Sequence, residues 1–174
     1  MIVTKFGGTS MASADQFKKV RNIIEEDSER QIVVVSAPGK RTKDDIKITD
    51  LLYTLYMHLQ YGVPYADIWD MIAGRYMEIA RDLELDYDIS VDLAAFKAEL
   101  NKHIDQNYLV SRGEFFSAKL MSAYLGFDFV DSKDIIRFNY NGTVDYERSE
   151  QNAKKLFSSH GRIVVPGFYG SYPN

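Results

Sequence analysis

Cysteine is absent from the 174-residue sequence, which excludes a disulfide framework, a thiolate nucleophile and a thiolate zinc site. Long hydrophobic runs are also absent, since no segment reaches the roughly 18 apolar residues that a membrane-spanning helix needs. The first residues, MIVTKFGG, lack the basic region and the apolar stretch of a signal peptide. Together these absences predict a cytoplasmic protein with no membrane among its partners.

An excess of positive charge is missing as well. The 21 lysines and arginines are outnumbered by 25 aspartates and glutamates, which gives a formal net charge of −4. This balance argues against nucleic acid as the main partner. His58, His103 and His160 are scattered along the chain without the spacing of a metal site, so no metal ligand is assigned.

The sequence does contain β-branched runs that alternate with amphipathic stretches. The run QIVVVS at 31–36 is unbroken, as in strands that are covered on both faces. Strands that alternate with helices predict an α/β fold, a three-layer sandwich with a mostly parallel sheet. The helical stretch at about 49–106 is long for one crossover, so part of it is expected to form a helical excursion beside the sheet. Strands are expected at 2–6, 31–36, 127–130, 135–138 and 162–166.

A glycine pair follows the first expected strand. Gly7 and Gly8 could let the backbone approach a ligand closely, with successive amides forming a nest for an anion. Lys5 would add a positive charge there, and Thr9 and Ser10 would add hydroxyl donors. The alternative is a tight strand-to-helix turn that needs a positive dihedral angle, with Lys5 on the surface. The spacing alone favours neither interpretation.

Three further polar residues have both a local and a functional explanation. Ser111 and Glu114 have the spacing of a capping box at a helix start, yet a carboxylate there could also grip an ammonium group. Thr49 could cap a helix, or its hydroxyl and the nearby amides could hold a carboxylate. Ser36, which closes a strand, is equally ambiguous.

A basic cluster lies between the second expected strand and the following helix. Its members are Lys40, Arg41, Lys43 and Lys47, diluted by two aspartates. A solvated flexible loop is the first interpretation of such a cluster, and a lid over anionic substrates is the second.

Five segments, taken in order, resemble the N-terminal part of the aspartate kinases, which have the amino acid kinase fold. Each segment alone is weakly informative, whereas the order is specific. The resemblance extends from one end of the chain to the other. The segments are KFGGTS at 5–10, VVVSAPGK at 33–40, KITDLL at 47–52, SRGEFFSAKL at 111–120 and PGFYGS at 166–171.

The resemblance implies an ATP-dependent, Mg²⁺-dependent phosphorylation of the β-carboxylate of L-aspartate, the first step toward lysine, threonine and methionine. It implies that Lys5 is catalytic and contacts the transferring phosphoryl group. Thr49 and Glu114 would hold the amino acid, with Ser36 close by. A homo-oligomer is expected for the full-length protein. The phosphate loop would consist of Lys5, Gly7, Gly8, Thr9 and Ser10.

The resemblance also implies that 1–174 is the amino-acid-binding part of a longer kinase domain. Family members continue past the PGFYGS segment into a glycine-rich stretch with an arginine and an aspartate, and then into an adenine-binding half. We therefore expect a truncated chain that is inactive alone. Two alternatives stay open, a sister kinase acting on another carboxylate or on carbamate, and a non-catalytic module that binds an amino acid.

Overall fold

A parallel sheet of four strands, in the order β1-β2-β4-β3, forms the centre of the computed structural model, which describes residues 1–173. All three strand pairs are parallel, and the register places Lys5 beside Val34 and Val34 beside Val165. Four of the five predicted strands are present, although the third is shorter than expected. The strands are β1 (Ile2–Phe6), β2 (Arg30–Val35), β3 (Asp128–Phe129) and β4 (Ile163–Pro166).

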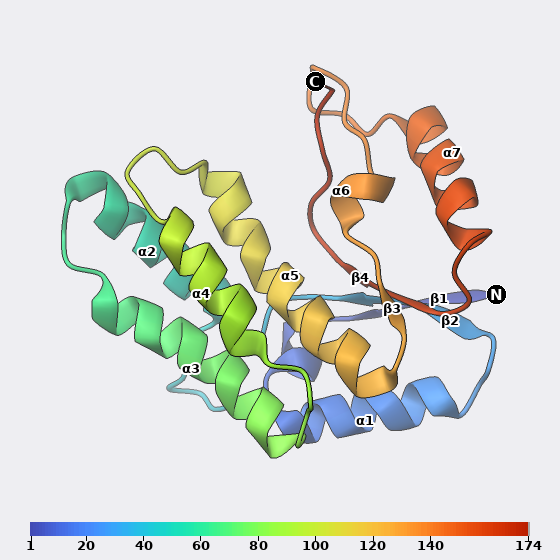
Figure 1. Ribbon diagram of the computed structural model, residues 1–174, viewed down its shortest axis with the longest axis horizontal. Helices are drawn as coiled ribbons and strands as arrows, with labels where there is room; N and C mark the ends of the chain where they lie inside the picture. The colour runs from blue at the N-terminus through green and yellow to red at the C-terminus, as the bar shows by residue number, and fades with distance from the viewer. Residues whose placement is uncertain (174) are drawn as a thin grey trace.

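The two faces of the sheet carry separate hydrophobic cores, because successive side chains of a strand point to opposite faces. Val33, Val35 and Val164 belong to the larger core, which includes buried residues of α1 and α5. Ile32 and Val165 belong to a smaller core, to which α6 and α7 contribute. Figure 1 shows α1 and α7 on opposite sides of the strands. The predicted three-layer α/β arrangement with a parallel sheet is therefore confirmed.

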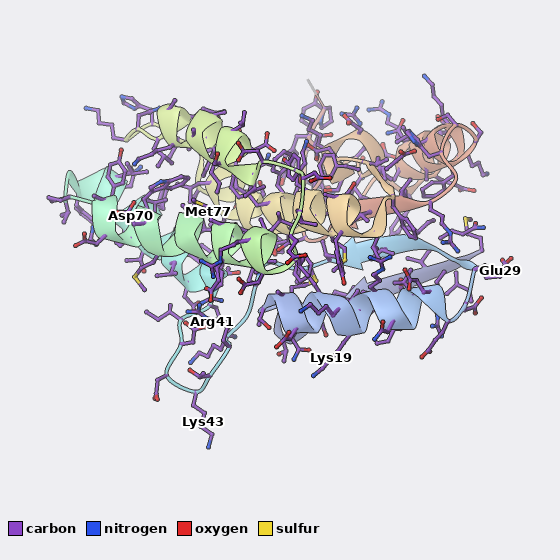
Figure 2. All side chains as sticks on the ribbon, turned by 60° about the horizontal axis from the view of Figure 1, so that its bottom comes forward. Lys19, Glu29, Arg41, Lys43, Asp70 and Met77 are labelled. Carbon is purple, nitrogen blue, oxygen red and sulfur yellow. The ribbon has the colours of Figure 1, made fainter. Side chains whose placement is uncertain are left out.

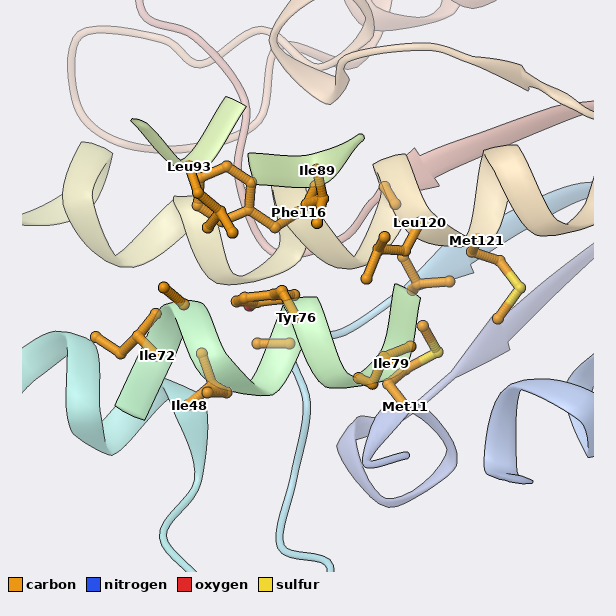
Figure 3. Close-up of a cluster of buried hydrophobic side chains, with 14 of the residues drawn as sticks. Met11, Ile48, Ile72, Tyr76, Ile79, Ile89, Leu93, Phe116, Leu120 and Met121 are labelled. Atoms are coloured by element: carbon orange, nitrogen blue, oxygen red, sulfur yellow. The ribbon is translucent and has the colours of Figure 1, made fainter. Parts of the chain in front are cut away.

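Three helices between β2 and α5 gather to one side of the sheet, with α5 running between them and the strands (Figure 1). Their apolar faces meet α5 in the larger core, where Tyr76 and Phe116 are in edge contact with their ring centroids 5.3 Å apart. Figure 3 shows Tyr76 among Ile48, Ile72 and Phe116 in this core. The helices are α1 (Ala14–Glu25), α2 (Ile48–Tyr61), α3 (Ala66–Asp82), α4 (Ile89–Glu99), α5 (Gln106–Leu125), α6 (Ser132–Ile135) and α7 (Tyr146–Phe157), with a 3-10 turn η1 (Gly8–Met11).

The strand predicted at 135–138 is wrong. Asp131 caps the short helix α6 there by accepting a hydrogen bond from the Lys133 backbone amide. Only isolated bridges follow, from Arg137 to Ser171 and from Phe138 to Val144. The apolar pair Ile135-Ile136 packs against the smaller core from a helix end, which a short apolar run cannot distinguish from a strand.

Candidate functional site

The loops that follow β1, β2 and β4 meet at one edge of the sheet. In parallel strands all carboxyl ends point the same way, so the residues that leave them become neighbours. The Ser36 amide donates to the Phe6 carbonyl at 3.1 Å, and the Gly167 amide donates to the Val35 carbonyl at 2.9 Å. The polar residues after each strand are thereby brought to a common edge.

Gly8 and Gly39 bring two of these loops into direct backbone contact. The Gly39 amide donates to the Gly8 carbonyl at 2.8 Å. A Cβ atom at Gly8 would lie 3.1 Å from the Ala37 carbonyl oxygen, and one at Gly39 would lie 2.8 Å from the Gly8 carbonyl carbon. Gly7 and Gly8 both have negative φ, so the interpretation as a turn with a positive dihedral angle is wrong. Position 8 therefore has little room for a larger residue, because the loop after β2 passes close by.

A cavity of about 420 Å³ opens at this edge. Predicted residues from four separate segments of the sequence line it, and no single segment could have indicated that the four meet. Its polar groups converge on a small volume, which is typical of a binding site. The residues lining it are Gly8, Thr9, Ser36, Ala37, Pro38, Gly39, Lys40, Lys47, Thr49 and Glu114.

Two larger hollows lie on the helical side of the molecule, away from this edge. One of about 510 Å³ is lined by 58–59, 62–66 and Lys97, and one of about 550 Å³ is lined by residues at the end of α3 and the start of α4. Neither contains a residue predicted for the site. We assign the site to the cavity of about 420 Å³ because it lies at the carboxyl ends of the strands and is lined by the predicted residues Ser36, Thr49 and Glu114.

Glu114 is the buried charged group of this cavity. Its side chain enters from α5, and the residue is only 8% exposed. One carboxylate oxygen, Oε1, accepts a hydrogen bond from the Ala37 amide at 3.3 Å. Burial raises the pKa of Glu114 to about 6, although the Ala37 amide and Arg112 act in the opposite direction. A carboxylate that is short of partners inside a cavity is suited to bind a cation.

The capping box predicted at Ser111 and Glu114 is wrong. Helix α5 begins more than a turn earlier, where the Asp105 side chain accepts from the Tyr108 amide at 2.8 Å. Ser111 lies inside the helix and donates to the Tyr108 carbonyl at 2.6 Å. Glu114 has therefore no capping role, and the local explanation of its presence no longer applies.

Tyr76 of α3 fixes the segment of α5 that carries Glu114. Its buried hydroxyl donates to the Gly113 carbonyl at 2.8 Å, and burial raises its pKa well above the usual value. Gly113 itself has no room for a side chain, since a Cβ atom there would lie 2.8 Å from the Ala37 Cβ. Glycine at this position therefore allows α5 to approach the loop after β2.

Ser36 and Thr49 both line the cavity. Thr49 is not the N-cap of α2, because Lys47 occupies that position and Ile48 is the first helical residue. The Ile48 amide is already bonded to the Pro38 carbonyl at 3.1 Å. Within residues 1–173 neither the Ser36 nor the Thr49 hydroxyl has a protein hydrogen-bond partner, so both can serve a ligand.

The basic cluster divides into two groups. Lys40 and Lys47 line the cavity. Arg41 instead pairs with Asp45 and Glu78, and Lys43 projects from the tip of the loop into solvent (Figure 2). The sequence analysis did not include Lys40 and Lys47 among the site residues. Their positions, Lys40 shortly after a strand and Lys47 just before a helix, could have indicated that they line the site.

The remaining predicted residues lie outside the cavity wall. Lys5 is exposed near the end of β1, and its register with Val34 puts it on the sheet face of the smaller core. Gly7 precedes η1, with nothing within 4 Å of the position a Cβ atom would take. Ser10 lies within η1 and donates its amide to the Gly7 carbonyl at 3.0 Å. Lys5, Gly7 and Ser10 therefore belong to the segment 5–10 around the glycine pair, called the glycine turn below, without lining the cavity.

Metal-binding clusters and membrane-spanning helices are two features that the described part of the chain lacks. Among residues 1–173, no group of three or more histidine, aspartate or glutamate side chains is placed to hold a metal ion. Across that same part of the chain, every helix is too short or too polar to cross a bilayer.

The raised pKa of Glu114 predicts how stability depends on pH. The folded chain holds the Glu114 proton more tightly than the unfolded chain, in which the glutamate has its ordinary pKa of 4.5. The contribution of Glu114 to the free energy of unfolding should therefore be fully present below pH 4.5 and be lost as the pH rises through about 6, by up to about 2 kcal/mol. Urea unfolding of the wild type and of Glu114→Gln between pH 4.5 and 7 measures this. An identical pH dependence in both proteins would contradict the assignment.

This chain matches one known protein family and several relatives within it. The Amino acid kinase family matches residues 1–174. Aspartokinase 3 of Bacillus subtilis is 33% identical over 186 aligned residues, and the match covers 98% of this chain and 40% of the relative. A chloroplastic bifunctional aspartokinase/homoserine dehydrogenase of Daucus carota is 32% identical, with 98% and 21% covered.

Solved structures of aspartate kinases are also similar to this chain. The aspartate kinase of Clostridium acetobutylicum superimposes with a TM-score of 0.94 at 41% identity, covering 98% of this chain and 39% of that one. Escherichia coli aspartokinase III in complex with aspartate and ADP gives a TM-score of 0.81 at 26% identity, with 99% and 41% covered. The chain thus spans about two fifths of the length of the relatives from Bacillus subtilis, Clostridium acetobutylicum and Escherichia coli. Because the family match extends over the whole chain and the parallel α/β sheet agrees with it, this chain belongs to the amino acid kinase family.

Proposed function

We propose that this chain is the amino-acid-binding part of an ATP-dependent aspartate kinase, which phosphorylates the β-carboxylate of L-aspartate. One observation carries the proposal. A buried carboxylate, Glu114, faces a cavity whose other charged groups are the two lysines Lys40 and Lys47. The support from relatives is that an Escherichia coli aspartokinase with this fold is described in complex with aspartate and ADP.

The polarity of the cavity matches an amino acid with an additional carboxylate. The α-ammonium group would pair with Glu114 in a charge-assisted hydrogen bond. A carboxylate would lie at the start of α2, where the Thr49 hydroxyl, Lys47 and the free amides of the first turn favour an anion. Ser36 would contribute a further hydroxyl. This division of charge selects a zwitterion over a plain dicarboxylate.

The reaction requires little acid-base chemistry from the protein. The β-carboxylate of aspartate has an ordinary pKa of about 3.9, so it is already an anionic nucleophile at neutral pH. What the site must do is orient that carboxylate and neutralise charge on the phosphoryl oxygens as they pass between donor and acceptor. Lys5 and the amides around Gly7 and Gly8 are the groups that we assign to this task.

The residues present fit a phosphate group at the glycine turn. The neighbouring loop fills the space beside Gly8, whereas nothing lies within 4 Å of the Cβ position of Gly7, so the backbone there is accessible to a phosphate. ATP would be held there by Lys5, Gly7, Gly8, Thr9 and Ser10. When bound, ATP supplies the phosphoryl group and Mg²⁺ neutralises its charge. Magnesium usually keeps water and phosphate oxygens as ligands, so it need not have a cage of protein carboxylates.

Three finer predictions accompany the proposal. The product would enter the pathway to lysine, threonine and methionine. The full-length enzyme would be a homo-oligomer. A cytoplasmic location also stays a prediction, and the carrot relative is named as chloroplastic.

A substrate panel on the full-length enzyme that contains this chain tests the proposal. We expect ADP release with L-aspartate and a kcat/KM at least about 100-fold lower with N-acetylglutamate, whose blocked amine cannot pair with Glu114. Carbamate, which lacks an ammonium group, should also be a poor substrate. Preference for either compound over aspartate would favour a sister kinase of the same family. Tight aspartate binding without any ADP release would favour a non-catalytic module.

A further inference from the structure

Arg75 of α3 is a buried cation that the site described above does not use. The residue is 4% exposed, and it does not line the cavity. Its Nη1 donates to the Gly39 carbonyl at 2.9 Å. Its Nη2 donates to the Asp45 carboxylate at 2.7 Å and to the Ile46 carbonyl at 3.4 Å. One guanidinium group thus holds the start and the end of the loop between β2 and α2.

The two backbone positions that Arg75 holds are the neighbours of the cavity lysines. Lys40 follows Gly39, and Lys47 follows Ile46. Gly39 also donates its amide to the Gly8 carbonyl at 2.8 Å. The Gly39 carbonyl accepts from Arg75 and the Gly39 amide donates to Gly8, so Gly39 links α3 to the loop that follows β1. A lysine could not make these contacts, because it lacks the planar fork that reaches two acceptors at once.

We propose that Arg75 is a positioning residue for the substrate cavity, which fixes the two ends of the loop 39–46 so that Lys40 and Lys47 face the bound amino acid. This inference rests on the function proposed above. It assigns a role to α3, a helix of the excursion beside the sheet, whose neighbouring residue Tyr76 holds the Glu114 side of the same cavity. Consecutive residues of α3 therefore support the cationic and the anionic walls.

Removal of Arg75 should leave a foldable protein, because Asp45 keeps a second partner. Arg41 contacts both carboxylate oxygens of Asp45, at 2.9 and 3.1 Å, and this guanidinium is the main cause that holds the Asp45 pKa below its usual range. Arg41 does not touch Gly39 or Ile46. Its side chain is 40% exposed and pairs with Glu78 at the surface. Arg41→Met is therefore the matched control for Arg75→Met.

Steady-state kinetics of the full-length enzyme measure the effect. We expect Arg75→Met to raise the KM for aspartate about tenfold, with kcat changed less than about threefold. Arg41→Met should leave both parameters within about twofold of the wild type. A purely structural role would instead lower the amount of active enzyme, reducing apparent kcat at unchanged KM. An unchanged KM in Arg75→Met, or an equal rise in both variants, would overturn the proposal.

Hydrogen exchange provides a test that needs no catalysis. In Arg75→Met, the Gly39 and Ile48 amides of the 174-residue chain should exchange at least about tenfold faster, while amides inside α5 keep their wild-type rates. Unchanged protection of Gly39 would overturn the proposal. If Arg75→Met does not fold, Arg75→Lys replaces it, and an unchanged KM in that variant would count against the inference. A wild-type enzyme that does not phosphorylate aspartate refutes the proposed function alone, since the exchange result still decides whether Arg75 fixes the loop.

Discussion

Replacement of Lys5 by alanine in the full-length enzyme is expected to lower kcat by about 10³-fold or more, with a much smaller change in the KM for aspartate. The reason is that a charge at the glycine turn acts mainly when the phosphoryl group is in transit. Lys5 is exposed near the end of β1, outside the wall of the cavity that Glu114 lines. Its flexible four-carbon stem leaves the ammonium group free to reach a phosphate. Steady-state kinetics with varied aspartate and ATP measure both parameters.

Lys19 provides the control for this substitution. It is an exposed lysine on the outer side of α1 (Figure 2), so Lys19→Ala removes the same charge at a distance from the glycine turn. We expect wild-type kcat in that variant. If the Lys5→Ala enzyme turns over at the wild-type rate, Lys5 has no part in the mechanism. The presence of an exposed lysine on this face of the sheet would then need another explanation.

Substitution of Glu114 by glutamine should raise the Kd for aspartate about 100-fold, the order expected when a buried charge-assisted hydrogen bond worth about 3 kcal/mol is lost. Glutamine keeps the shape and can still accept from the Ala37 amide, so the cavity should persist. The wild type should also bind aspartate less tightly below about pH 6, where Glu114 becomes protonated. Calorimetric titration with aspartate at pH 5 and pH 7.5 measures both effects.

Two controls separate this result from a general disturbance. Glu150→Gln changes an exposed carboxylate on α7 that pairs with Lys154 at the surface, and it should not alter aspartate affinity. The Glu114→Gln protein should show a pH-independent affinity over the range in which the wild type varies. If aspartate binds the glutamine variant as tightly as the wild type, the ammonium group is recognised elsewhere.

The fold could be predicted from local patterns where those patterns were strong. The runs at 2–6 and 31–36 are β-branched, end at polar or glycine residues, and form β1 and β2 with boundaries shifted by at most one residue. The start of α5 was missed because Asp105 gives a single capping signal, while Ser111 and Glu114 imitate a stronger one. The strand at 135–138 was wrong because a short apolar run has no length to show its period.

The site was predictable in its residue types more than in its geometry. Residues that follow parallel strands gather at one edge, which is why Gly8 and Ser36 meet, whereas Glu114 reaches them from the middle of α5. The roles of Gly39 and Arg75 depend on contacts between loops and helices far apart in the chain, and no periodicity encodes them. Lys40 and Arg41 are adjacent and alike in sequence, yet only the fold sends one to the cavity and the other to Asp45.

A crystal structure of the chain with L-aspartate bound is the most direct test of the claim that the cavity between Glu114 and the start of α2 recognises the amino acid. The account predicts the α-ammonium nitrogen within about 3 Å of a Glu114 carboxylate oxygen, and a substrate carboxylate beside Thr49 and Lys47. Aspartate bound in a hollow of the helical group, or bound with its carboxylates toward Glu114, would contradict it.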